Sequence, residues 1–156
     1  MKNNTDKHLG IYVHIPFCRK KCDYCDFYSV CSYDENLLDR YLKALVKQLD
    51  DYTAGGSRYS VDTLYIGGGT PSVFGGKRIA AIVKEIGKRF DFTRDVEITV
   101  EVNPESADKA LFKQLRKAGV NRISMGVQSS CDSQLKALGR LHDFKTAENA
   151  VLLCRQ

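Results

Sequence analysis

Residues 11–25 read Ile11-Tyr-Val-His-Ile-Pro-Phe-Cys18-Arg-Lys-Lys-Cys22-Asp-Tyr-Cys25. The first part is β-branched or aromatic apart from one histidine, which predicts a strand over Ile11–Ile15. A proline then ends the strand, and three cysteines follow within eight residues. Because a loop after a strand can wrap around a metal centre, this stretch predicts a strand that leads into a thiol site.

The rest of the chain alternates strand patterns with helical patterns. Further strands are expected at Thr63–Ile66, Val96–Val102 and Arg122–Val127. Amphipathic helices are expected at about Glu35–Asp51, Lys77–Arg89, Ala107–Ala118, Ser133–Leu138 and Lys145–Leu153. This alternation is typical of βα units and predicts an α/β fold with about four parallel βα units.

Local signals refine the boundaries. Ser106 is expected to cap the third helix with Asp108 in its first turn, and Gly119 is expected to end that helix in a left-handed conformation. The stretch Thr53–Ser57 is rich in glycine and predicts a loop.

Composition predicts one ordinary domain. The chain has 156 residues, of which 43% are hydrophobic, and a net charge of +5 that is too small to argue for nucleic acid. We expect a polar tail over residues 1–8 and one domain over residues 9–156. No run is long and apolar enough for a membrane helix and no secretory signal is visible, so a cytoplasmic protein is expected. The apolar group Val151–Leu153 has nothing after it to pack on, which favours a truncated larger barrel.

The number of closely spaced cysteines favours an iron-sulfur cluster. A structural zinc site needs four ligands and a thioredoxin-type site needs an isolated C-x-x-C, whereas a cubane cluster held by three thiolates leaves one iron open. The alternatives are reduced loop thiols, or a zinc site completed by His14 or Cys31.

The spacing C-x3-C-x2-C after a first strand resembles the radical S-adenosylmethionine (SAM) superfamily. More of the chain is similar to the oxygen-independent coproporphyrinogen III oxidase family within it. The motifs are Tyr12-Val-His-Ile-Pro-Phe-Cys18, Gly67-Gly-Gly-Thr-Pro-Ser72, Glu101-Val-Asn-Pro-Glu105, Arg122-Ile-Ser-Met-Gly-Val-Gln128 and Leu138-Gly-Arg-Leu-His142. The resemblance implies a partial (β/α) barrel of the radical SAM TIM type, with about four units of a normally six-unit open barrel and without the family's C-terminal domain.

One position separates two branches of that family. The oxidases carry a further cysteine two residues after the third ligand, whereas Phe27 stands at that place here. The chain therefore resembles the haem-chaperone branch, the HemW type, more closely than the oxidases. Cys31 lies farther along and is not equated with the missing cysteine.

The resemblance implies a [4Fe-4S] cluster on Cys18, Cys22 and Cys25. It implies SAM contacts at eight further positions, which are Tyr12, Tyr24, Gly68, Gly69, Thr70, Glu101, Gln128 and Arg140. In the family, the glycine loop contacts the amino group of the methionine part of SAM. In the oxidases, the positions of Gln128 and Arg140 contact a second SAM molecule. No catalytic residue beyond the cluster is assigned.

Each of these positions has a structural alternative. The glycine loop could be a tight turn ended by Pro71, and Glu101 could be a solvated acid at a strand end. Arg140 could lie on the surface of a helix. Tyr12 could belong to the core, and Tyr24 could simply pack against the cluster.

Other polar residues are expected to be structural. His14 and His142 are expected to be hydrogen-bonded in the core rather than to ligate haem. The basic run Arg19–Lys21 is expected to be solvated, with guidance of an acidic electron donor as the alternative. Cys131 and Cys154 do not have the sequence spacing of metal ligands, and they are expected to be small buried residues or free thiols.

The resemblance implies a protein that binds haem and delivers it to a target protein, with an oxidoreductase-type core but no oxidase activity. The first alternative is oxidative decarboxylation of coproporphyrinogen III to protoporphyrinogen IX. The second is an inactive truncated fragment. The implied partners are haem or a porphyrinogen, a haem-accepting protein and a flavodoxin-like electron donor.

Overall fold

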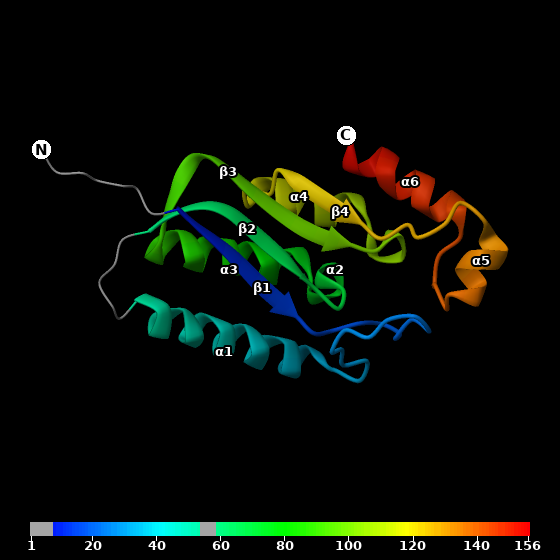
Figure 1. Ribbon diagram of the computed structural model, residues 1–156, viewed down its shortest axis with the longest axis horizontal. Coiled ribbons are helices and arrows are strands. Elements are labelled where there is room, and N and C mark those ends of the chain that lie inside the picture. The colour runs from blue at the N-terminus through cyan, green and yellow to red at the C-terminus, as the bar shows by residue number, and fades with distance from the viewer. Residues whose placement is uncertain (1–7, 54–58) are drawn as a thin grey trace, which may run out of the picture.

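The computed structural model describes residues 8–53 and 59–156. Within them, parallel strands form one sheet in the order β1-β2-β3-β4 (Figure 1). The strands are β1 (His8–Ile15), β2 (Ser60–Gly68), β3 (Asp91–Val102) and β4 (Arg122–Met125). The helices are α1 (Glu35–Thr53), α2 (Pro71–Phe74), α3 (Gly76–Arg89), α4 (Lys109–Lys117), α5 (Asp132–Ala137) and α6 (Phe144–Cys154), with a short 3-10 helix η1 (Pro104–Ser106). The α/β class and the four parallel βα units are confirmed.

The core lies between the sheet and the helices that run alongside it, among them α1 and α3 in Figure 1. Along β1, Val13 and Ile15 are buried, whereas Tyr12 is exposed and His14 is only half-buried. In α3 the apolar residues repeat every three or four positions, so Ile79, Ile82 and Ile86 all face the same core. Burying this stripe against the strands fixes each helix on the sheet.

The strands end together at one edge of the sheet. Ile15 pairs with Gly68, and Val102 pairs with Met125. Because all strands run in the same direction, the loops that follow them gather at this edge, where ligands bind in parallel α/β folds. The opposite face of the sheet from the helices carries polar and aromatic side chains, including Tyr12, His14 and Tyr65.

Several predicted boundaries were wrong by a few residues. His8 was assigned to the tail but pairs with Ser60 as the first residue of β1, while residues 1–7 lie outside the described residues. Of the expected loop, Thr53 is the last residue of α1, and residues 54–58 are likewise outside. The fourth strand ends at Met125, because the amide of Val127 bonds back to the carbonyl of Met125 in a turn.

The short helix α2 was not predicted from the sequence. Pro71 ends the glycine loop, as the turn alternative expected, and it does so by opening α2, where its fixed φ suits the first helical position. Gly119 has φ of 96°, as expected for a residue that ends a helix. No helix in the described ranges is both long and apolar enough to cross a bilayer.

The cap of α4 is Asp108 rather than Ser106. The Asp108 carboxylate accepts the Leu111 amide at 2.6 Å, whereas the Ser106 hydroxyl donates to the Asn103 carbonyl. We expect Asp108→Ala to lower the free energy of unfolding by about 1 kcal/mol, because an amide at the helix start loses its acceptor. Asp108→Asn keeps a side-chain acceptor and should cost only a few tenths of that; urea denaturation measures both. Equal losses for the two variants would contradict this cap.

Candidate functional site

A cavity of about 220 Å³ opens where the strands end. Its walls are the cysteine loop after β1 and the loops that follow β2, β3 and β4. Ten of the eleven predicted site residues line it: Cys18, Cys22, Tyr24, Cys25, Gly68, Gly69, Thr70, Glu101, Gln128 and Arg140. The remaining predicted residue, Tyr12, does not line the cavity.

The cysteine loop is anchored at its base by Phe17. This ring is 2% exposed and stacks on Phe74 with centroids 5.9 Å apart. The Cys18 amide donates to the Val30 carbonyl at 3.1 Å, which closes the loop on itself. At the tip, the Asp23 amide donates to the Leu138 carbonyl at 3.2 Å. The loop is therefore held both by the core and by the segment that follows α5.

The three cysteines differ in burial. Cys18 is buried, Cys22 and Cys25 are partly exposed, and all three are free thiols. Burial raises the pKa of the Cys18 thiol, and the hydrogen bond from Thr70 opposes that rise. No three His, Cys, Asp or Glu side chains within the described ranges are gathered closely enough to hold a single metal ion. Cys18, Cys22 and Cys25 all line the same cavity, which is the arrangement that a cluster held by three thiolates requires.

The glycine loop lies against the base of the cysteine loop. The Gly69 amide donates to the Ile15 carbonyl at 2.8 Å. A Cβ atom on Gly69 would stand 2.8 Å from the Phe17 carbonyl oxygen and 2.9 Å from the Cys18 sulfur. Gly68 has φ of 117°, in the region that favours glycine. The loop is a tight turn and also a cavity wall that only glycine can form this closely.

Glu101, the next-to-last residue of β3, is fixed by two donors rather than solvated. Its Oε1 accepts the Tyr65 hydroxyl at 2.7 Å, and its Oε2 accepts the Gly68 amide at 3.0 Å. Burial and the neighbouring Glu101 carboxylate raise the pKa of Tyr65, so this hydroxyl stays a donor at neutral pH. The carboxylate is thereby aimed at the cavity from the strand end.

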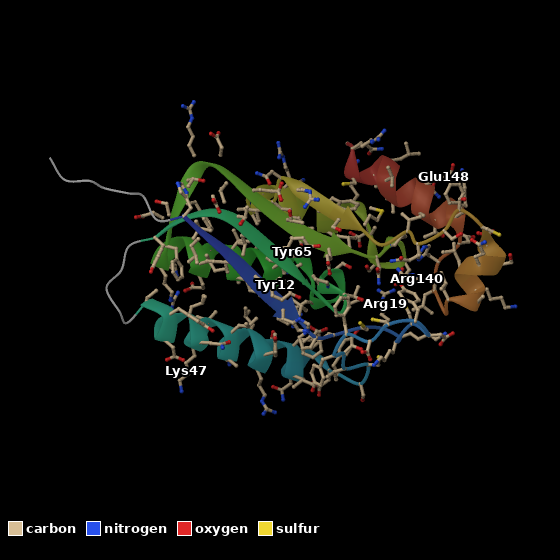
Figure 2. The ribbon with its side chains drawn as sticks, in the orientation of Figure 1. Tyr12, Arg19, Lys47, Tyr65, Arg140 and Glu148 are labelled. Carbon is tan, nitrogen blue, oxygen red and sulfur yellow. The ribbon has the colours of Figure 1, made fainter. Side chains whose placement is uncertain are left out.

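Tyr12 is neither a core residue nor a cavity residue. Its ring is 58% exposed and stacks on Tyr65 with centroids 6.1 Å apart. Its hydroxyl bonds to Nδ1 of His14 at 3.0 Å, and burial and the nearby Glu101 charge raise its pKa. Figure 2 shows the two tyrosines side by side on β1 and β2, with Arg140 beyond the strand ends.

Arg140 is not a surface residue of a helix. It lies after α5, and its side chain is 4% exposed. Nη2 donates to Oδ1 of Asn103 at 2.8 Å and to the Gly126 carbonyl at 2.9 Å, while Nη1 is 3.3 Å from the Cys22 sulfur. Its Nε is buried and has no hydrogen-bond partner among the described residues. A cation is thus fixed beside the cysteine loop.

Two further residues predicted as SAM contacts, Gln128 and Tyr24, line the cavity and are exposed. Gln128 was expected to end the fourth strand but lies three residues beyond it, with φ of 69°. Tyr24 is 48% exposed, and its hydroxyl is 3.4 Å from Nη1 of Arg140. Burial raises the pKa of Tyr24, and the Arg140 charge opposes that rise.

Both histidines singled out in the sequence are hydrogen-bonded. His14 contacts the Tyr12 hydroxyl and the Tyr28 carbonyl, but it is half-buried on the open face of the sheet and not in the core, so that part of the prediction was wrong. His142 is buried, with Nδ1 3.2 Å from Glu105 and Nε2 3.2 Å from the Val127 carbonyl.

The remaining predictions concern exposed groups. The basic run Arg19–Lys21 is exposed, as expected, although Lys20 and Lys21 reach the cavity rim. Cys131 was expected to be buried or free; it is exposed and free, while Cys154 is partly buried.

Asn103 was missed as a site residue. The sequence pattern indicated only a turn at Asn103-Pro104, yet its side chain lines the cavity and contacts both Thr70 and Arg140. The signal was available, because Asn103 directly follows β3 at the same edge as Glu101.

Comparison with known proteins agrees with this geometry. Residues 12–156 match the Radical SAM superfamily. The chain is 41% identical over 145 residues to a protein named heme chaperone HemW from Escherichia coli, and 39% identical over 151 residues to one from Haemophilus influenzae. These matches cover 93% and 94% of this chain but only 38% and 39% of those relatives.

A solved structure shares the fold. Coproporphyrinogen III oxidase (HemN) from Escherichia coli, described as a radical SAM enzyme, superposes with a TM-score of 0.88 at 31% identity. The match covers 96% of this chain and 35% of that one. The superfamily match extends over nearly the whole chain, from the strand before the cysteine loop onward, and the chain belongs to the radical SAM superfamily.

Proposed function

We propose that this protein binds haem and delivers it to other proteins, with a [4Fe-4S] cluster and SAM as its cofactors. The observation that carries the proposal is Phe27. It lines the cavity beside Cys25 and is 64% exposed, at the place where the oxidases have a further cysteine. An apolar ring there offers no thiol, and its exposed face suits an apolar ligand. The proteins named heme chaperone HemW, at 34–41% identity, support the same choice.

The cavity fits the two cofactors by its chemistry. Cys18, Cys22 and Cys25 supply thiols for three irons, and the Gly69 wall leaves room that a Cβ atom would fill. The buried Nε of Arg140, which has no hydrogen-bond partner within residues 8–53 and 59–156, is a donor suited to an anionic group. Glu101 supplies a carboxylate for the amino or ribose groups of SAM. When bound, the cluster supplies an electron to the sulfonium of SAM.

The protein's own residues orient the Glu101 carboxylate, shield the base of the cysteine loop and give the cavity rim its charge. The Gly68 amide and the Tyr65 hydroxyl hold the Glu101 carboxylate in one orientation. Phe17 and Phe74 close the base of the cysteine loop against water. Lys20 and Lys21 give the rim a positive charge, which suits an acidic electron donor of the flavodoxin-like kind. The proposal also includes a partner protein that accepts the haem, and a cytoplasmic location for this protein.

The proposal is tested by two measurements on the same anaerobically reconstituted chain. Haem titration followed by absorbance is expected to reach a stoichiometric end point. Incubation with coproporphyrinogen III, SAM and reductant is expected to give no decarboxylated product. Product formation without haem binding would overturn the proposal in favour of the oxidase.

The oxidase is the second candidate because of the 0.88 TM-score to the coproporphyrinogen III oxidase structure. The chain also shares 31% identity with that enzyme, less than with the HemW proteins. The product assay above decides between the two.

We expect Glu101→Gln to weaken SAM binding about tenfold. The amide lacks the negative charge and one of the acceptor oxygens that the carboxylate would offer to the amino or ribose groups of SAM, and one lost bond to a charged group is worth about 1.5 kcal/mol. Equilibrium dialysis with labelled SAM on the reconstituted chain measures the change. Glu97→Gln is the matched control, since Glu97 lies on the same strand but pairs with Arg122 outside the cavity. Equal affinities for wild type and Glu101→Gln would contradict the assignment.

A further inference from the structure

Two of the cavity cysteines are contacted by side-chain donors from distant parts of the chain. The Thr70 hydroxyl, after β2, lies 3.4 Å from the Cys18 sulfur, and both groups are buried. Nη1 of Arg140, after α5, lies 3.3 Å from the Cys22 sulfur. Neither contact follows from the spacing of the cysteines.

Asn103 joins these two donors. Its Oδ1 accepts Nη2 of Arg140 at 2.8 Å, and its Nδ2 lies 3.2 Å from the Thr70 hydroxyl oxygen. The result is one continuous chain of hydrogen bonds from Cys22 through Arg140, Asn103 and Thr70 to Cys18.

The direction of every bond in this chain is forced. A guanidinium can only donate, so the amide oxygen of Asn103 must face Arg140. The amide nitrogen then faces Thr70 and donates to its hydroxyl oxygen. With that oxygen already accepting, the Thr70 proton is left to point at the Cys18 sulfur. Both ends of the chain therefore present a donor to sulfur.

We infer that Asn103 is a positioning residue that aims two hydrogen-bond donors at the sulfurs of the proposed cluster and so raises its reduction potential. The inference rests on the proposed cluster site. Hydrogen bonds to ligand sulfur stabilise the reduced cluster, which carries the extra negative charge, and groups in the outer shell tune metal sites in this way.

The geometry separates this role from that of a turn residue. The backbone of Asn103 already serves the turn, since its carbonyl accepts the amide and hydroxyl of Ser106. Its side chain takes no part in that turn and forms its hydrogen bonds with Thr70 and Arg140. Replacing the side chain alone therefore tests the sulfur contacts without removing the turn.

The experiment measures the midpoint reduction potential of the anaerobically reconstituted chain by titration with dithionite, followed by electron paramagnetic resonance. Thr70→Val removes one donor without changing charge or shape and should shift the potential to more negative values. Asn103→Leu releases both donors and should shift it further in the same direction. Thr70→Ser keeps a hydroxyl and should restore the wild-type potential.

Thr99→Val is the matched control. Thr99, in β3, is buried like Thr70, but its hydroxyl donates to Glu97 and it does not line the cavity. Its potential should equal that of the wild type. Iron and sulfide content and circular dichroism are measured for every variant, and if Thr70→Val does not fold, Asn103→Leu carries the test.

The outcomes separate the inference from the proposed function. Full clusters with unchanged potentials in Thr70→Val and Asn103→Leu would overturn the inference and leave the cluster site standing. A wild-type chain that assembles no cluster would overturn both. A shift in Thr99→Val as large as that in Thr70→Val would also overturn the inference, because the effect would then not depend on sulfur contacts.

Discussion

Replacing Cys18 by alanine is expected to abolish cluster assembly. We expect about four irons per reconstituted chain in the wild type and close to none in Cys18→Ala. The sulfur of Cys18 is buried at the base of the cavity between Gly69 and Thr70, so no solvent-exposed thiol can take its place. Iron and acid-labile sulfide counts, with the charge-transfer absorbance of the cluster, measure the loss.

Cys31→Ala is the matched control for this prediction. Cys31 lies in the same long loop but is exposed and does not line the cavity. It should keep the wild-type iron content. A Cys18→Ala chain that retains its iron, or a Cys31→Ala chain that loses it, would move the ligand set away from the three predicted cysteines.

Gly69→Ala is expected to damage stability and cluster binding together. The added methyl group would meet two backbone carbonyl oxygens, of Phe17 and Ile15, and the Cys18 sulfur, all within 3.1 Å. Because backbone cannot rotate away, the base of the cysteine loop must shift. Overpacking of this kind costs about 1–3 kcal/mol of unfolding free energy. Urea denaturation of the chain and its iron content after reconstitution measure the two effects.

Gly10→Ala tests whether the effect belongs to this position. Gly10 lies in the first half of β1, and its added methyl group would meet only the Thr63 hydroxyl, the movable end of a side chain. It should keep full iron content and lose less stability. If Gly69→Ala retained both wild-type stability and wild-type iron, the close packing of the glycine loop on Cys18 would be unimportant for the site.

Periodicity predicted which elements form but not where they begin. The stretch Val96–Val102 was recognised because its apolar residues are dense, yet β3 starts at Asp91. The added residues are mostly polar, and they are held in the sheet because Asp91 and Phe92 pair with Ser60 and Val61 of β2. Pairing with a neighbouring strand is a tertiary effect that local sequence does not express.

The candidate site was predictable to the extent that it depends on strand ends. Glu101 and the glycine loop follow consecutive parallel strands, so their meeting at one edge follows from the order of elements. The orientation of side chains does not follow from that order. Tyr12 turns onto the open face of the sheet and stacks on Tyr65, and Asn103 enters the cavity because Arg140 supplies a donor from a segment far along the chain.

The segment after α5 contacts the tip of the cysteine loop, and this has a consequence for the order of events during biosynthesis. Asp23 and Cys22 are among the first described residues to leave the ribosome, but their partners Leu138 and Arg140 are made more than a hundred residues later. Until then the loop tip has neither its backbone acceptor nor the cation beside its sulfur. We therefore expect the nascent chain to present open, oxidisable thiols for most of its synthesis and to become ready for cluster insertion only after Arg140 has emerged.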